Sequence, residues 1–124
     1  MNTVLDYKPR LPRYAAQATS GLVFELYRWE PGAGSSQQRQ QIRGARLLEV
    51  SRGGVRFEID RELHEGTDVE VTLAMGGAYQ YTQQAVIRWC AASGETFHCG
   101  AAFRELLPWE VLGELILRGH VSTD

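Results

Sequence analysis

The stretch that decides the fold is GARLLEVSRGGVRF, residues 44–57. Apolar side chains such as Val55 and Phe57 alternate with charged ones, and a Gly-Gly pair lies in the middle. Alternation with a period of two places successive side chains on opposite faces of a strand, and paired glycines favour a tight turn. The stretch therefore predicts two antiparallel strands, 44–51 and 55–60, each with one buried and one polar face.

The same signals recur on both sides of this stretch. Segments 20–29, 67–75, 78–91 and 96–104 combine β-branched or aromatic residues with turn-forming residues at their ends. By contrast, residues 31–41 (PGAGSSQQRQQ) contain no apolar anchor. We therefore expect four further strands and one long polar loop.

The C-terminal segment has a different period. Residues 109–118 (WEVLGELILR) place apolar residues at helical spacing between Pro108 and Gly119, which favour the start and the end of a helix. We expect Trp109 to cover one end of the sheet and Trp89, on the longest strand, to lie in the core. Together these elements predict an all-β fold of six antiparallel strands, a small closed β-barrel or a sandwich, with a short C-terminal helix.

The composition is that of one ordinary domain. The chain has 124 residues, of which 44% are apolar, and no apolar run is long enough for membrane insertion. We expect a flexible basic lead over residues 1–14, one domain over 15–119 and a tail over 120–124. Two cysteines are too few for a disulfide framework, which favours a cytoplasmic location.

Charge is distributed unevenly along the chain. The formal net charge of −2 argues against a surface for long DNA or RNA. Residues 1–56, however, carry nine basic and four acidic side chains, whereas residues 57–124 carry four and eleven. Twelve of the thirteen basic residues are arginine, which suits bidentate phosphate contacts. We therefore expect a small anionic ligand, if one binds, to contact the N-terminal half.

The sequence lacks the residue patterns of the common enzyme classes. His64, His98 and His120 do not have the spacing of a metal site, and there is no nucleophile elbow, phosphate loop or dinucleotide fingerprint. Cys90 and Cys99 fall opposite each other on a predicted hairpin and are expected to be reduced, apolar thiols. These observations predict a binding protein, not an enzyme, without a catalytic residue, metal or cofactor.

Polar residues gather around the Gly-Gly turn. Glu49 offers a carboxylate, Ser51 a hydroxyl, and Gly54 both unusual backbone freedom and close access to the main chain. Arg52 and Arg56 flank them with positive charge suited to an anionic ligand. The turn is therefore the strongest candidate for a binding site.

The segment EVSRGGVRF resembles a motif of the PilZ domain family, (Asp/Asn)-x-Ser-x-x-Gly, with Glu49, Ser51 and Gly54 at its three defined positions. The stretches AVIRW (85–89) and HCGAAF (98–103) resemble the late strands of the same family. The resemblance implies a six-stranded barrel that binds cyclic di-GMP. It also implies that the three motif positions contact a guanine and its phosphate.

A second motif of that family, Arg-x-x-x-Arg, lies in a flexible lead before the first strand. Here Arg13 fits its second arginine, but Pro9 occupies the first position. A complete Arg-x-x-x-Arg occurs at Arg39 and Arg43, which lie beyond the first predicted strand. The expected cyclic di-GMP contacts are Arg10, Arg13, Glu49, Ser51, Arg52 and Gly54, with Lys8, Arg39, Arg43 and Arg56 as additional candidates.

Two functions follow from the resemblance. In the first, the protein is a cyclic di-GMP receptor or adaptor that changes conformation on binding and signals to a protein partner. In the second, it is a degenerate PilZ-like domain that has lost the nucleotide and acts through protein contacts, in pilus or flagellar motility or in biofilm regulation.

A third class, a barrel for single-stranded nucleic acid, would use Tyr79 and Tyr81 as stacking residues. The helix is apolar on more than one side, which favours a homodimer contact.

Overall fold

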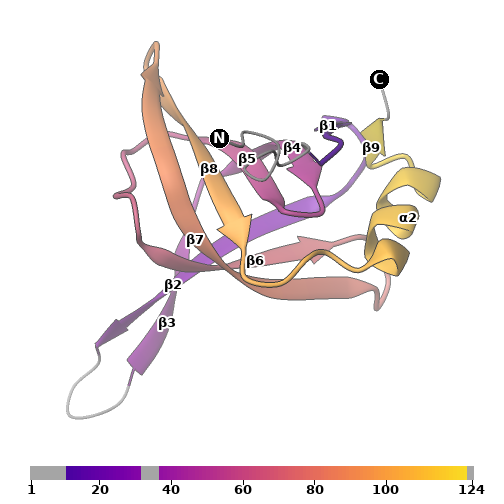
Figure 1. Cartoon of the computed structure of the whole chain (residues 1–124), viewed down its shortest axis with the longest axis horizontal. Helices are drawn as coiled ribbons and strands as arrows, with labels where there is room; N and C mark the ends of the chain where they lie inside the picture. The colour runs from indigo at the N-terminus through magenta and orange to yellow at the C-terminus, as the bar shows by residue number, and fades with distance from the viewer. Residues whose placement is uncertain (1–10, 32–36, 123–124) are drawn as a thin grey trace, which may run out of the picture.

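The computed structural model describes residues 11–31 and 37–122. In these residues nine antiparallel strands form one sheet in the order β3-β2-β6-β7-β8-β5-β4-β1-β9, and one short helix lies between β8 and β9 in the chain (Figure 1). The predicted fold class, an antiparallel β structure with a short C-terminal helix, is confirmed. The elements are β1 (Tyr14–Ala16), β2 (Val23–Pro31), β3 (Gln37–Ile42), β4 (Arg46–Ser51), β5 (Gly54–Ile59), β6 (Asp68–Ala74), β7 (Gln80–Ser93), β8 (Thr96–Phe103), α2 (Trp109–Leu117) and β9 (Val121–Ser122).

The sheet has three strands more than the six that alternation predicts. β3 lies within and just beyond the segment expected to be a polar loop, and it pairs with β2 along one edge of the sheet. Its sequence, QQRQQI, has no apolar alternation and so gave no strand signal. It still forms a strand because the backbone hydrogen bonds to β2 do not require buried side chains. The other two, β1 and β9, have three and two residues, which are too few to show a period.

Both chain ends of the described region take part in the sheet. Tyr14, at the boundary of the expected lead, pairs with Val50 of β4. Val121, within the expected tail, pairs with Ala16 of β1 and is 4% exposed. The residues just before β1 are therefore placed directly beside the strand that ends at Ser51.

The core shows that the sheet is strongly curved. The rings of Phe24 on β2 and Phe57 on β5 lie 5.6 Å apart between centroids, although β6, β7 and β8 separate these strands in the sheet order. Phe57 and Leu26 are completely buried. Burial of a large apolar side chain contributes about 1.5–3 kcal/mol. The inner face of the sheet therefore supplies the core, as the alternation predicted.

The helix packs against the sheet through one face. Leu112 and Leu115 are buried, whereas Leu117 is 82% exposed. Trp109 is 65% exposed, so the prediction that it covers the sheet was wrong: it lies in the first helical turn, on the side away from the core. The predicted helix stop is confirmed at Gly119, which has a φ of 74°. Among the described residues, no helix is long and apolar enough to cross a membrane.

Candidate ligand-binding site

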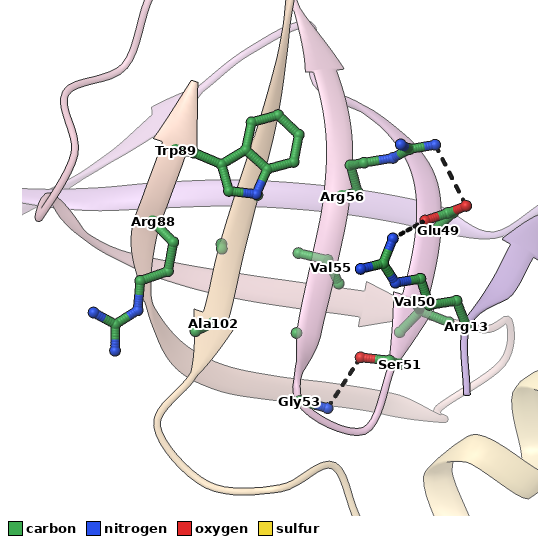
Figure 2. Close-up of a pocket in the computed structure, with 13 residues that line it drawn as sticks. Arg13, Glu49, Val50, Ser51, Gly53, Val55, Arg56, Arg88, Trp89 and Ala102 are labelled. Carbon is green, nitrogen blue, oxygen red and sulfur yellow. Dashed lines mark hydrogen bonds and ion pairs between the residues drawn. The ribbon is translucent and has the colours of Figure 1, made fainter. Parts of the chain in front are cut away.

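A hollow of about 220 Å³ lies on the outer side of the β4–β5 turn. Its floor and walls come from the residue before β1, the two strands of the turn, and the facing parts of β7 and β8 (Figure 2). It joins three segments that are far apart in the sequence. The lining residues are Arg13, Glu49, Val50, Ser51, Gly53, Gly54, Val55, Arg56, Arg88, Trp89, Gly100, Ala101 and Ala102.

Two arginines face one carboxylate in this hollow. Arg13 Nη1 lies 3.8 Å from Glu49 Oε1, and Arg56 Nη2 lies 3.4 Å from Glu49 Oε2 (Figure 2). The Arg13 side chain is 52% exposed, so water screens its contact, and a pair of this kind contributes little to folding stability. The two cations are therefore held near the turn by a weak, exchangeable interaction.

Arg56 has an unused hydrogen-bond donor. Its Nε is buried and has no partner in the described part of the chain, a property it shares there only with His120 Nδ1. A buried donor without an acceptor costs about 1–3 kcal/mol. A ligand oxygen would satisfy this Nε only if the side chain moved, whereas the charges of Arg13, Arg56 and Arg88 in the lining already favour an anionic occupant.

The turn itself is organised by Ser51. Its Oγ accepts a hydrogen bond from the backbone N–H of Gly53 at 3.1 Å. A serine hydroxyl also carries one donor hydrogen, so Ser51 can donate to a ligand while it holds the turn. The side chain therefore holds the turn and keeps a donor hydrogen that a ligand in the hollow could accept.

Gly54 is required for a reason other than the one expected. Neither Gly53 nor Gly54 has a positive φ, so the predicted need for an unusual backbone conformation was wrong. A Cβ atom on Gly54 would instead lie 2.1 Å from the carbonyl oxygen of Ala101 on β8. Gly54 is therefore needed because β8 lies so close to the end of the turn.

The far wall of the hollow comes from a β-bulge in β7. The register between β7 and β8 shifts between Ile87 and Trp89, and both Arg88 and Trp89 are exposed. Trp89 is 42% exposed, so the prediction that it lies in the core was wrong. Its indole lies against Gly100 of β8, where an added Cβ would be only 2.3 Å from Nε1.

Sequence reasoning did not include Arg88 and Trp89 among the site residues. Strict alternation from Ala85 and Ile87 places Trp89 on the buried side, and the bulge breaks that alternation. Gly100, directly opposite Trp89, is the one signal in the sequence, because a glycine within a strand often marks a bulge or a close approach.

Arg52 lies near the turn but does not line the hollow. Its Nε donates a hydrogen bond to the carbonyl of Leu107 at 2.8 Å, and its guanidinium lies 4.1 Å from the centroid of a Trp109 ring. These contacts join the β4–β5 turn to the start of α2. In this structure Arg52 therefore links the turn to the helix.

The remaining predicted residues are elsewhere. Arg39 on β3 forms an ion pair of 2.5 Å with Glu70, and the exposed Arg43 lies between β3 and β4. Neither of them lines the hollow. Lys8 and Arg10 fall outside the described residues. The structure therefore brings together Arg13, Glu49, Ser51, Gly54 and Arg56 from the predicted set.

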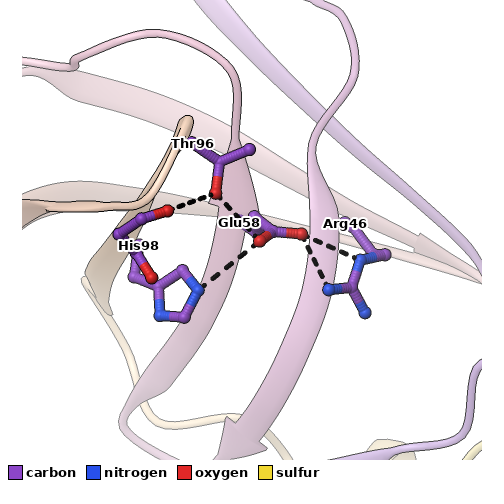
Figure 3. A network of polar contacts seen from close by, with 5 residues as sticks. Arg46, Glu58, Thr96 and His98 are labelled. Atoms are coloured by element: carbon purple, nitrogen blue, oxygen red, sulfur yellow. Dashed lines mark hydrogen bonds and ion pairs between the residues drawn. The ribbon is translucent and has the colours of Figure 1, made fainter.

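A second polar cluster lies on the outer face of β4, β5 and β8 (Figure 3). Arg46 donates to Glu58 Oε1 through Nη2 at 2.7 Å and through Nε at 3.2 Å, and Thr96 Oγ1 donates to Glu58 Oε2 at 2.9 Å. His98 Nε2 lies 3.6 Å from the same oxygen. The hydrogen bonds from Arg46 and Thr96 hold the pKa of the Glu58 carboxyl below its usual value of 4.5.

In the described residues, no three His, Cys, Asp or Glu side chains are placed to hold a metal ion. Comparison with known families shows that the PilZ domain matches residues 31–118. This range includes Glu49, Ser51, Gly54 and the bulge of β7, and Arg13 precedes it. A search of curated proteins gave no significant match.

Proposed function

The chain belongs to the PilZ domain family, whose members are non-catalytic receptor domains for cyclic di-GMP, and on this premise we propose that it is a cytoplasmic receptor for that nucleotide. The observation that carries the proposal is the position of Arg13. It lies in the same hollow as Glu49, Ser51 and Gly54, which occupy the three defined positions of the family motif.

The chemistry of the hollow suits a guanine nucleotide with two phosphodiesters. Arg13 and Arg56 supply positive charge, and a hydrogen bond to a charged group contributes about 1.5–3 kcal/mol. Ser51 can donate to a phosphate oxygen, and the Glu49 carboxylate can accept from guanine N–H groups. Trp89 adds an exposed aromatic ring, on which a base can stack.

Binding would release Arg13 from Glu49, because a phosphate is a stronger partner for a guanidinium than a carboxylate 3.8 Å away. Arg13 directly precedes β1, which pairs with β4 and with β9. A movement of Arg13 would therefore be transmitted through β1 to β9, the strand that follows helix α2. We propose that this movement is the signal a protein partner detects.

A second function is supported by a different observation. Both oxygens of Glu49 already face an arginine, Glu replaces the Asp or Asn of the family motif, and Pro9 replaces the first arginine of the lead. These three features favour a domain that keeps its sheet, does not bind the nucleotide and acts through protein contacts. The exposed Trp109 and Leu117 on α2 would then belong to the contact surface.

Calorimetric titration with cyclic di-GMP separates the two functions. The receptor proposal predicts heat of binding and a rise in the melting temperature at nucleotide concentrations below about 100 μM, which corresponds to a binding free energy of roughly −5.5 kcal/mol. Absence of both signals up to that concentration would exclude the receptor and leave the protein-contact function.

Ser51→Ala tests whether the heat comes from this hollow. Loss of one neutral hydrogen bond should cost about 0.5–1.5 kcal/mol, which weakens binding about two- to tenfold. Ser93→Ala is the matched control, because Ser93 is exposed at the β7–β8 turn and does not line the hollow. Equal affinities for the two variants would place the nucleotide elsewhere.

A further inference from the structure

Two cysteines face each other across the β7–β8 hairpin. Cys90 and Cys99 are register partners, as the sequence predicted, and both are free thiols with their Sγ atoms 3.0 Å apart. Directly opposed residues of antiparallel strands have Cα atoms about 4.5–5.5 Å apart. That spacing falls within the range of about 4.4–6.8 Å that a disulfide spans. The fold therefore places the two sulfurs where a bond can form without moving the backbone far.

We propose that Cys90 and Cys99 are a redox modification site that forms a reversible intrachain disulfide. The two thiols are not equivalent. Cys99 is completely buried, whereas Cys90 is only partly buried, so we assign Cys90 as the thiol that a small reagent reaches first. The backbone N–H of Leu63 and the thiol of Cys99 both donate to Cys90 Sγ, at 3.4 Å and 3.0 Å.

This asymmetry sets the order of the reaction. Cys90 is the attacking thiol, because it is the more accessible one and its sulfur already accepts two hydrogen bonds. Cys99 is the resolving thiol. Burial, followed by the hydrogen bond and charge of Cys90, raises the pKa of Cys99 to about 12, which keeps it protonated before the first step. Its interaction with a negatively charged Cys90 disappears once Cys90 has reacted.

The oxidant that the reaction needs is a low-molecular-weight disulfide. The Cys90 thiolate attacks one of its sulfurs, forms a mixed disulfide and releases one thiolate. Cys99 then loses its proton, attacks Cys90 Sγ and expels the second thiolate. The pair is oxidised by two electrons, the external disulfide is reduced to two thiols, and the two protons from Cys90 and Cys99 end on those thiols.

The disulfide would join β7 to β8 one residue away from Trp89 and Gly100, which form a wall of the hollow. The bulge between Ile87 and Trp89 interrupts regular pairing at that point. An S–S bond of about 2.05 Å would draw the sulfurs closer and limit relative movement of the two strands there. The proposal does not depend on nucleotide binding, so it can be tested without any nucleotide.

The test compares the folded protein with the same chain unfolded in urea. Each is equilibrated with mixtures of reduced and oxidised glutathione, quenched with acid, alkylated and weighed by mass spectrometry. The folded protein should form an intrachain disulfide at a glutathione ratio at least roughly tenfold less oxidising than the unfolded chain needs, because strand pairing has already closed the loop. The proposal would be overturned if, at a glutathione ratio that oxidises the unfolded chain, the folded protein still carried two alkylated thiols.

Two single variants test the order of attack. Cys99→Ala should stop at a glutathione adduct on Cys90, whereas folded Cys90→Ala should remain unmodified because Cys99 is buried. Far-UV circular dichroism checks that each variant is folded. If a variant does not fold, the comparison of folded and unfolded wild-type protein still tests the proposal. An adduct on Cys99 in folded Cys90→Ala would contradict the assigned roles.

Discussion

Two contacts between an arginine and a glutamate have opposite characters in this protein. On the β2–β3 hairpin, Arg39 forms a 2.5 Å ion pair with Glu70, whose side chain is only 11% exposed, and its guanidinium lies 3.7 Å from the centroid of the Tyr27 ring. At the hollow, Arg13 lies 3.8 Å from Glu49, and both side chains are more exposed. The first contact is short and partly buried, and the second is long and solvated.

The difference separates an arginine that the fold holds in place from an arginine that is free to exchange partners, which is the one we propose to bind the nucleotide. Arg39 compensates the charge of a nearly buried carboxylate, whose other printed contact is a 3.4 Å hydrogen bond from the neutral amide of Gln84, so a ligand could take Arg39 only at a cost to the fold. Separating Arg13 from Glu49 costs little free energy, because exposed ion pairs contribute little to stability. Arg39 and Arg43 match the spacing of the arginine motif, yet the weaker contact of Arg13 is better suited to exchange for a phosphate.

The largest effect is expected at the turn that holds Glu49 and Ser51 in place. Gly54→Ala puts a Cβ 2.1 Å from the Ala101 carbonyl oxygen and should lower the free energy of unfolding by about 3 kcal/mol, as overpacked sites do. Urea unfolding measures this loss. Gly113→Ala is the matched control: no atom lies within 4 Å of its added Cβ, and in a helix it should stabilise by about 0.5–1 kcal/mol. Equal stability of the two variants would contradict the close packing at Gly54.

Nucleotide affinity tests the comparison directly. Arg13→Ala should weaken cyclic di-GMP binding about tenfold or more, because it removes a contact between charged groups worth about 1.5–3 kcal/mol. Arg39→Ala should change the dissociation constant less than about twofold, since Arg39 does not line the hollow. Calorimetry on the folded variants gives both values. Equal losses would show that the hairpin arginine also contacts the nucleotide.

Folding stability should show the reverse order. Arg39→Met removes the charged partner of Glu70 and the stacking on Tyr27, and should cost about 1 kcal/mol, allowing for the exposure of Arg39. Arg13→Met should stay within about 0.5 kcal/mol of the wild type. The midpoints of urea unfolding at neutral pH give the comparison. A larger loss for Arg13→Met would mean that its contact with Glu49 is structural.

Part of this arrangement could be predicted from the sequence. Alternation predicted the strands on both sides of the turn, and the motif spacing grouped Glu49, Ser51 and Gly54, which do lie together. Short-range patterns work here because one hairpin places all three residues. Arg13 could be assigned only by resemblance, and β1, whose three residues have no detectable period, places it beside β4.

The other features of the site depend on contacts between residues far apart in the sequence, which a local sequence pattern cannot predict. Trp89 reaches the surface because of a bulge, and Gly54 is needed because of a distant strand, β8. Arg39 was a candidate by motif spacing and Arg52 by its charge beside the turn, and only their partners Glu70 and Trp109 show what they do. An arginine's role is therefore set by which acceptor or ring the fold brings to it.

A third arginine–glutamate contact, Arg46 with Glu58, extends the comparison to a smaller effect. The pKa of Glu58 is lowered first by the hydrogen bond from Arg46 and then by the one from Thr96. The stabilisation is therefore fully present above the carboxyl's ordinary pKa of 4.5 and is lost as the pH falls through the lowered pKa of the folded state. The ratio of folded to unfolded protein should decrease in that acidic range, and Glu58→Gln should remove this part of the dependence.

Carboxyl titration by nuclear magnetic resonance resolves the two causes. Arg46→Met should raise the pKa of Glu58 towards its ordinary value by more than Thr96→Val does, because the arginine is the larger cause. The opposite order would mean that the exposed Arg46 is too mobile to hold the carboxylate. Arg46, whose side chain is 61% exposed, would then belong with the exchangeable arginines such as Arg13, and distance alone would not separate the two kinds of contact.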